Sequence, residues 1–353
     1  MTRRRITSRD VAARAGVSRT TVSFVLNGVT EANISEETRR RVLAAVEELG
    51  YVPDAAAQAL ASGRTQTIGI VFRTYPHIIA DLAHLQIIEG LMEIARQFGV
   101  RLLIDSVRHT DTADTYINLA RTKRIDGLIL SDSRVDDRVL HNLVNDGFPI
   151  VLLGRLPDVK VCSIEFDNRG GARAAVEHLL AQGHTRIGFV GYAPRAFTGV
   201  AERLCGYQDA LVTAGIAFDE TLVRYGDFSP GSGFTTTSSL LEAPGAPTAV
   251  FVSSDVLAFG ALAAIHARGL AIPDDIAVVG FDDNPLAQFA TPPLTTVRIS
   301  FEEMGRQAGK MLLDLFLRDV EPGRNMLLES KLVVRASSIR DNRQPHVPDT
   351  LGT

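Results

Sequence analysis

The residues whose types could do chemistry come early in this chain, inside the stretch ITSRDVAARAGVSRTTVSFVLN at residues 6–27. If the second half of this stretch is helical, Arg19, Thr20 and Phe24 point away from the face that carries Val22 and Val25. A guanidinium and a hydroxyl can hydrogen-bond to base edges, and a phenyl ring can contact the methyl group of thymine. This combination on one exposed helix face indicates DNA recognition.

Two short helices must position these side chains. Apolar and small residues recur at the three- and four-residue steps of a helix, and the repeat is broken once, at Gly16. Glycine accepts the positive φ of a turn. Ser18 can then cap a second helix, as Thr7 or Ser8 can cap the first. The pattern predicts a helix-turn-helix, although the spacing alone would also fit an ordinary surface hairpin of helices.

The charge of the chain is uneven. Residues 1–64 hold ten Lys and Arg against seven Asp and Glu, a balance of +3, so the whole-chain charge of -4 leaves -7 on the remainder. The arginines at positions 3, 4, 5 and 9 can neutralise DNA phosphates. A small basic head on a larger acidic body fits DNA binding by the head alone. A basic tail without a partner would have the same balance.

A third helix and a linker follow. Ser35 and the acidic residues after it are typical of a capping box, which predicts a helix that ends at Gly50 and completes a headpiece of residues 1–53. Residues 54–65, DAAAQALASGRT, are rich in alanine and favour helix. A helix this short is marginal alone in water. We therefore expect a hinge helix that folds only against a partner.

From Thr67 onward, short apolar runs alternate with longer amphipathic stretches, which is typical of parallel sheets covered by helices on both faces. The length of residues 66–340 predicts two doubly wound α/β lobes, followed by a tail at 341–353. No run of about eighteen apolar residues occurs, and no apolar segment follows the arginine-rich start. We expect a soluble, cytoplasmic protein with two reduced cysteines, Cys162 and Cys205, and without a metal site or cofactor.

Polar and aromatic residues follow several of the predicted strands. Ligands of open parallel sheets bind at the carboxyl ends of strands, and carboxylates and rings at such ends suit a hydroxylated ligand. A helix cap or a turn would explain any one of these residues taken alone, so the prediction depends on their repetition. The strand-end residues are Phe72, Tyr75, Ser131, Asp132, Asp227, Phe228, Ser254, Asp255, Asp282, Asp283 and Asn284.

Together these segments resemble the LacI/GalR, or lactose-repressor, family of bacterial transcription regulators. The resemblance covers nearly the whole chain, including ISEETRRRVLAAVEELGYVPDAAAQALASGRTQTIGIV and IAVVGFDDNPLAQFATPPLTTVRISFEEMG. It implies a homodimer on pseudo-palindromic operator DNA, a hinge helix, and a core of the periplasmic-binding-protein type I fold. In that fold the chain crosses between lobes three times. The expected N-lobe is about residues 66–162 and 295–324, and the C-lobe about 163–292 and 325–340.

The resemblance also assigns DNA contacts. Phe24 replaces an arginine that is common in the family, which leaves a thymine methyl as its expected contact. Leu60 matches the hinge leucine that opens a base step in the minor groove, with Ala57 beside it. A contact between two hinge helices is the simpler alternative for Leu60. The implied base-reading residues are Arg19, Thr20 and Phe24, and those near phosphates are Thr7, Ser18, Thr21 and Asn27.

In the core, the resemblance implies that Arg203 grips effector hydroxyls and that Asp282 accepts from them through charge-assisted hydrogen bonds. Asp282 could instead only cap the turn at Asn284. Phe228 would stack on a sugar face. The other candidate effector-binding residues are Ser254 and Asp255 on the far wall, with Phe72, Tyr75 and Asp132 from the other lobe.

The sequence thus predicts an operator-binding transcriptional repressor controlled by a small molecule, with sugars as the leading class. A sugar-uptake binding protein shares the core fold, but it needs a secretory signal and no DNA head, which residues 1–64 contradict. An enzyme is disfavoured because neither a G-x-S-x-G elbow nor a P-loop or metal constellation occurs. The effector and the direction of its effect on DNA binding are not specified.

Overall fold

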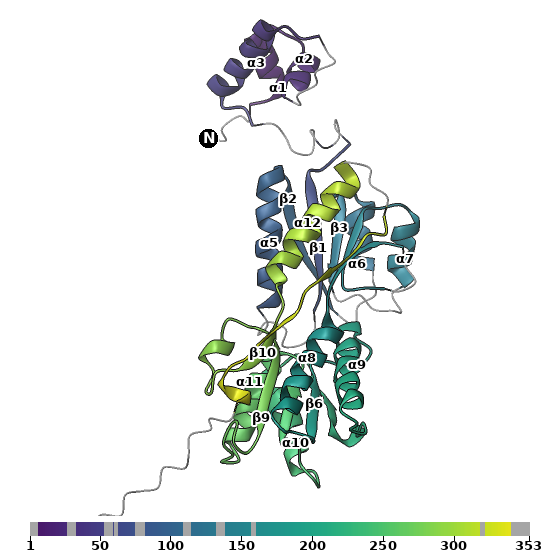
Figure 1. The fold of residues 1–353 in the computed structure, drawn as a ribbon. Helices are drawn as coiled ribbons and strands as arrows, with labels where there is room; N and C mark the ends of the chain where they lie inside the picture. Colours follow the sequence, from purple (N-terminus) through teal and green to yellow (C-terminus); the bar gives the residue numbers. More distant parts are fainter. Residues whose placement is uncertain are drawn as a thin grey trace, which may run out of the picture.

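The computed structural model describes residues 6–26, 33–52, 59, 63–74, 82–108, 114–131, 138–156, 160–317 and 322–339. They form a helical headpiece and a core of two lobes, each built on its own sheet (Figure 1). Among these residues we find no helix with the length and apolarity that a bilayer crossing requires. Most of the expected hinge helix and the whole tail lie outside the described residues, as do Asn27, Ala57, Leu60, Tyr75 and Asp132.

The headpiece contains α1 (Ser8–Ala15), α2 (Arg19–Leu26) and α3 (Glu36–Leu49) around a small shared core. Gly16 ends α1 at a φ of 66°, and the Ser18 hydroxyl accepts from a backbone amide 3.0 Å away to begin α2. The predicted helix-turn-helix is confirmed. The buried positions of α3 are Val42 and Ala45. The next residue after Val42, Leu43, is exposed because it lies about 100° around the helix from it.

The first lobe holds a sheet in which every neighbouring pair is parallel, in the order β11-β5-β4-β3-β1-β2. Residues alternate across it: Ile70 packs toward α5 (Ala83–Phe98) and α12 (Phe301–Leu317), and Val71 toward α6 (Asp114–Arg121) and α7 (Arg138–Asn145). The strands are β1 (Thr67–Thr74), β2 (Arg101–Arg108), β3 (Gly127–Ser131), β4 (Ile150–Leu153), β5 (Cys162–Phe166) and β11 (Asn325–Leu328).

The second lobe repeats this plan in the order β12-β10-β9-β8-β6-β7, with only β12 antiparallel to its neighbour. One face is covered by α8 (Asn168–Ala181) and α9 (Thr198–Thr213), and the other by α10 (Pro230–Glu242) and α11 (Asp255–His266). The strands are β6 (Ile187–Gly191), β7 (Val223–Tyr225), β8 (Ala249–Val252), β9 (Ala277–Asp282), β10 (Thr295–Arg298) and β12 (Lys331–Val333).

The chain crosses between the lobes three times, as expected, but each crossing lies one strand later than predicted. β5 and β11 both pair within the first sheet, and β10 pairs with β9 in the second. The crossings therefore fall at residues 166–168, 298–301 and 328–331. The reason is that β5, β10 and β11 each pair with the sheet that the chain is about to leave, because their backbone N–H and C=O groups find hydrogen-bond partners there. The chain therefore crosses after each of these strands and not before it.

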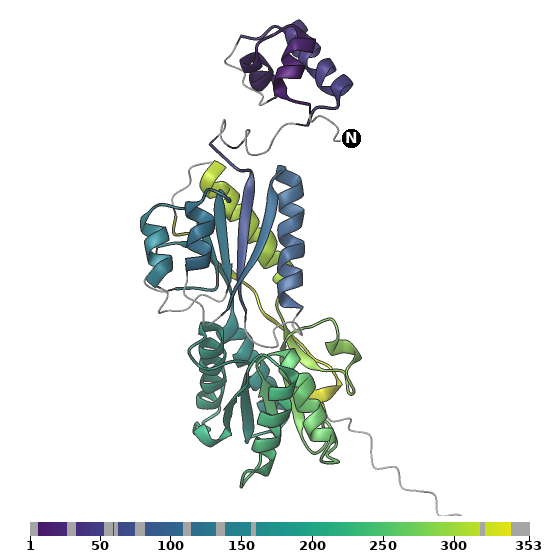
Figure 2. The ribbon, with the colours of Figure 1, turned by 180° about the vertical axis from the view of Figure 1, so that it is seen from behind.

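Helix α12 runs along the first lobe from the second crossing toward the end of the sheet at which β1 begins (Figures 1 and 2). It packs closely on α5. A Cβ atom on Gly305 would lie 2.1 Å from the carbonyl oxygen of Ile87, so only glycine permits this approach. Near the other end of α12, Arg64 Nη2 donates to the Phe316 carbonyl oxygen at 3.0 Å. The linker that follows the headpiece is thereby attached to α12.

Candidate functional site

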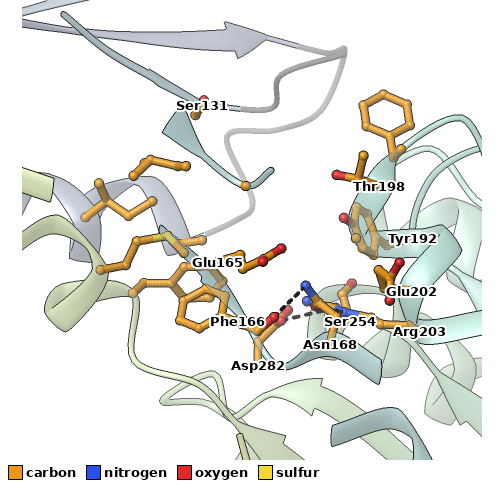
Figure 3. Close-up of a pocket in the computed structure, with 18 of the residues that line it drawn as sticks. Ser131, Glu165, Phe166, Asn168, Tyr192, Thr198, Glu202, Arg203, Ser254 and Asp282 are labelled. Carbon is orange, nitrogen blue, oxygen red and sulfur yellow. Dashed lines mark hydrogen bonds and ion pairs between the residues drawn. The ribbon is translucent and has the colours of Figure 1, made fainter. Parts of the chain in front are cut away.

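A cleft lies between the lobes, where the carboxyl ends of strands from both sheets meet (Figure 3). This is the position at which open parallel sheets bind ligands. Side chains from β3 and β5 reach it from the first lobe, and side chains from α9 and β9 reach it from the second. The polar described residues that line it are His84, Ser131, Arg155, Glu165, Asn168, Tyr192, Thr198, Glu202, Arg203, Ser254 and Asp282.

Arg203 of α9 is held in one position at the wall of this cleft. Its Nε donates to Asn168 Oδ1 at 2.8 Å, and its Nη1 donates to the Ser253 carbonyl oxygen and to Asp282 Oδ1, the latter at 3.4 Å. The guanidinium carbon also lies 3.7 Å from the ring centroid of Phe281, a cation–π contact. The structure thus brings Arg203 and Asp282 together, and most of the guanidinium is already occupied by protein groups.

The loops beside this pair contain side-chain-bearing residues in the left-handed region. The φ angles are 67° at Phe228, 115° at Asp282 and 54° at Asp283, conformations that cost about 1–3 kcal/mol each. Two ion pairs hold the turn: Arg298 Nε donates to Asp283 Oδ2 at 2.6 Å, and Arg335 Nη2 donates to Asp283 Oδ1 at 2.7 Å. These pairs offset the strain and leave the Asp282 carboxylate directed at the cleft (Figure 3).

Aromatic rings form two sides of the cleft. In the second lobe, the ring of Phe228 lies 5.4 Å from that of Tyr192 and 5.5 Å from that of Phe197, centroid to centroid. Toward the first lobe, Phe166 and Phe301 meet edge to face at 5.3 Å. Rings and hydrogen-bonding groups therefore line the same cleft, which suits a ligand with both apolar faces and polar edges.

Asp255 does not line the cleft, contrary to the prediction. Its side chain is buried at the start of α11, where Oδ1 accepts from Thr296 Oγ1 at 2.6 Å and Oδ2 accepts from the Asn284 amide at 2.7 Å. Burial raises the pKa of this carboxyl to about 7, opposed by those hydrogen bonds. Ser254 lines the cleft and also caps α11. The next residue along the helix points elsewhere, into the space between β9 and β10.

Phe72 is also set back from the cleft. It is buried, and its ring lies 4.2 Å from the imidazole of His84, which does line the cleft. The prediction placed Phe72 in contact with the effector because its strand was expected to end there. In the structure β1 continues for two more residues, to Thr74. The buried ring of Phe72 therefore packs against His84 and does not line the cleft itself.

Several cleft residues were not predicted from the sequence, among them Tyr192, Asn168, Glu165 and Glu202. Tyr192 directly follows β6, so the strand-end rule applied to that strand would have found it. Asn168 and Glu165 required recognition of β5, which the sequence pattern did not distinguish. Glu202 lies within α9, next to Arg203, and no local signal marks a mid-helix residue as facing another lobe.

The headpiece presents a second candidate surface. Arg19 and Thr20 are exposed on the first turn of α2, and Phe24 is 37% exposed one turn later. The hydroxyls of the residues expected near phosphate already make local bonds. Thr7 Oγ1 donates to Asp10 at 2.7 Å, and the Ser18 and Thr21 hydroxyls lie 2.9 Å apart. These bonds fix the start of each helix and so the orientation of α2.

Protein-family comparisons match both parts of the chain. Residues 7–54 match the model of bacterial regulatory proteins of the lacI family, and residues 176–338 match a periplasmic binding protein-like domain. The HTH-type transcriptional regulator CelR of Thermobifida fusca is 36% identical over 339 residues, 95% of this chain and 99% of the relative. The HTH-type transcriptional repressor CytR of Escherichia coli K12 is 34% identical over 334 residues, 94% of this chain and 96% of the relative.

Solved structures agree with these matches. A lac repressor dimer bound to operator and the anti-inducer ONPF superposes with a TM-score of 0.84 at 32% identity, covering 96% of this chain and all of that chain. A complex of the regulator CelR with cellobiose superposes with a TM-score of 0.73 at 34% identity, covering 94% of this chain and all of that chain.

Proposed function

Because the chain belongs to the LacI family of bacterial regulatory proteins, we propose that its interlobe cleft binds a saccharide that controls repression of transcription. The chain is a DNA-binding transcriptional regulator that acts as a homodimer on operator DNA, and it is not an enzyme. The observation that carries the proposal is the ion pair of Arg203 and Asp282 placed between aromatic walls.

A saccharide matches the chemistry of this cleft. Adjacent sugar hydroxyls both donate and accept, so one can donate to Asp282 while its neighbour accepts from Asn168 or from a guanidinium N–H of Arg203. The C–H faces of a pyranose can pack against the ring of Phe228. The complex of the related CelR with cellobiose supports this class of ligand.

The headpiece reads the operator in this proposal. Arg19 and Thr20 contact base edges from the first turn of α2, and Phe24 contacts a thymine methyl. Their exposure on one turn-and-a-half of helix supports this role. Backbone and minor-groove contacts are proposed for Thr7, Ser18, Thr21 and Asn27, and for Ala57 and Leu60 of the hinge at 54–65. The operator DNA of a bacterium lies in the cytoplasm, so the regulator acts in that compartment.

The surface proposed for the homodimer runs along one side of both lobes. In the first lobe, Leu85 and Met92 of α5 are exposed, next to Ile104 of the edge strand β2. In the second lobe, Leu286 and Phe289 are exposed in the segment after β9. Both views place α5 and this segment on the same side of the molecule (Figures 1 and 2). A second copy would bury these apolar groups.

Calorimetry and thermal unfolding of the full chain test the saccharide proposal. A sugar that binds only the native state raises the melting temperature, so a panel of mono- and disaccharides that includes cellobiose should contain at least one such ligand. Arg203→Ala and Asp282→Ala should each lower the affinity for that ligand by roughly tenfold or more, because each removes a charged hydrogen bond. Arg173→Ala, an exposed arginine of α8 outside the cleft, is the matched control. If no sugar binds, or if both cleft variants bind normally, the proposal is wrong.

A further inference from the structure

Two carboxylates face the cleft from opposite lobes. Glu165 projects from β5 of the first lobe, and Glu202 projects from α9 of the second (Figure 3). Burial raises the pKa of Glu165, Arg155 opposes this increase, and the nearby carboxylates of Glu202 and Asp167 add to it. Negative charge is therefore concentrated where the lobes meet.

The cations of the cleft do not balance this charge for a ligand. Arg203 is occupied by Asp282, Asn168 and a backbone carbonyl oxygen. Arg155 Nη1 lies 3.9 Å from Glu165 Oε1, but 56% of its side chain is exposed, so solvent screens it. Within the part of the chain that the structure describes, Glu202 makes no ion pair. A ligand entering the cleft therefore meets the acceptor oxygens of Glu165 and Glu202, and of the two arginines among the described lining residues only Arg155 is not held by several protein groups.

We propose that Glu165 and Glu202 form a charge filter, so that the effector is an uncharged saccharide and sugar phosphates and sugar acids are rejected. The inference rests on the proposed function, since it specifies which saccharides the cleft accepts. Hydroxyl groups of one neutral sugar donate to both carboxylates. A phosphate or carboxylate placed between them adds a third negative charge beside the partly buried Glu165 and the exposed Glu202, where solvent weakens the repulsion of like charges without removing it.

The pair also links selectivity to the arrangement of the lobes. Because the two carboxylates belong to different lobes, their repulsion opposes close approach in the empty cleft. A ligand that donates to both removes this repulsion and holds the lobes together. An anionic sugar adds its own negative charge to the same space, so it offsets less of this repulsion even where its shape fits. The same two residues therefore select the ligand and favour the ligand-bound arrangement.

The test is calorimetry of the full chain with sugars matched in shape and different in charge. Glucose is compared with glucose 6-phosphate and glucuronate, and cellobiose with cellobiose 6′-phosphate. Each neutral sugar that binds should bind at least tenfold more tightly than its anionic counterpart. Glu202→Gln keeps the size and acceptor oxygen of the side chain, so it should reduce this ratio at least threefold. The double variant with Glu165→Gln should reduce it further.

Controls separate charge from bulk and from misfolding. Glu177→Gln replaces an exposed carboxylate of α8 that lies outside the cleft, and it should leave the ratio unchanged. Thermal unfolding of each variant reports whether it folds. Equal binding of neutral and anionic sugars, or a ratio unaffected by both cleft variants, overturns the filter while leaving a saccharide effector in place. If no sugar of either kind binds, the proposed function itself fails, and the filter fails with it.

Discussion

Replacing Asp255 with asparagine should flatten the pH dependence of this protein's stability. In the folded chain, the Asp255 carboxyl is buried and its pKa is raised from 3.8 to about 7. The native state therefore holds a proton that the unfolded chain releases near pH 4. Stability from this group is fully present below the unfolded pKa and is lost as the pH rises through the folded pKa. Asparagine has no proton to lose.

The size of the effect follows from these two values. Between about pH 5 and pH 8, a carboxyl whose pKa moves from 3.8 to about 7 on folding lowers the free energy of unfolding by about 2.6 kcal/mol. The asparagine side chain reproduces the protonated state: its oxygen can accept from the Asn284 amide, and its NH2 can donate to Thr296 Oγ1. The hydrogen bonds to Thr296 and Asn284 are retained, so the variant should fold.

Urea unfolding followed by circular dichroism at several pH values between about 5 and 8 measures this difference. The free energy of unfolding of the wild type should fall relative to that of Asp255→Asn by about 2.6 kcal/mol across the range, and the variant should be the more stable protein at pH 8. Asp274→Asn, which changes an exposed aspartate of the same lobe, should follow the wild type. Parallel curves for wild type and Asp255→Asn would refute the reasoning.

Three further predictions concern packing, assembly and coupling. Gly305→Ala should lower the stability by about 1–3 kcal/mol because its Cβ collides with a carbonyl oxygen of α5, whereas Gly231→Ala in α10, which meets nothing closer than 3.7 Å, should be neutral or slightly stabilising in the same melting assay. Leu85→Glu should shift the protein toward monomer in sedimentation experiments, and Val212→Glu, on the far side of the second lobe, should not; dimers that survive Leu85→Glu would exclude that surface. Arg64→Ala should leave sugar affinity unchanged in calorimetry. It should reduce the effect of the sugar on operator affinity, measured by fluorescence anisotropy. If that effect is unchanged, the contact between Arg64 and the Phe316 carbonyl oxygen is dispensable.

The headpiece and the plan of the core could be predicted from the sequence because their signals are local. Gly16 and Ser18 mark the end of one helix and the start of the next within three residues. Strands buried on both faces appear as continuous apolar runs, such as residues 127–131, between amphipathic stretches. These features depend on nearest neighbours along the chain. They do not require knowledge of how the lobes meet.

The cleft was only partly predictable, because its residues are selected by tertiary packing. Ser254 and Asp255 are adjacent after one strand, yet Ser254, the N-cap with an extended backbone, lines the cleft, while Asp255, the first helical residue, turns into the protein and is buried. The strand-end rule cannot separate them. Glu202 faces the other lobe only because of where α9 lies against the crossings. The observed lobe boundaries differ from the predicted ones for a similar reason. The short strands at the crossings are assigned to a lobe by the strands they pair with in the sheet, which the local sequence does not specify.

Helix α12 connects the cleft to the segment that follows the headpiece. Phe301 and Met304, in its first turn, line the cleft, and Phe316, near its far end, accepts from Arg64. At 1.5 Å per residue these ends are about 22 Å apart, so a tilt of about 5° around the first turn would move the Phe316 carbonyl by about 2 Å. Hydrogen bonds tolerate far less than that. A rotation of a few degrees at the cleft would therefore be enough to break this hydrogen bond between α12 and the segment that follows the headpiece.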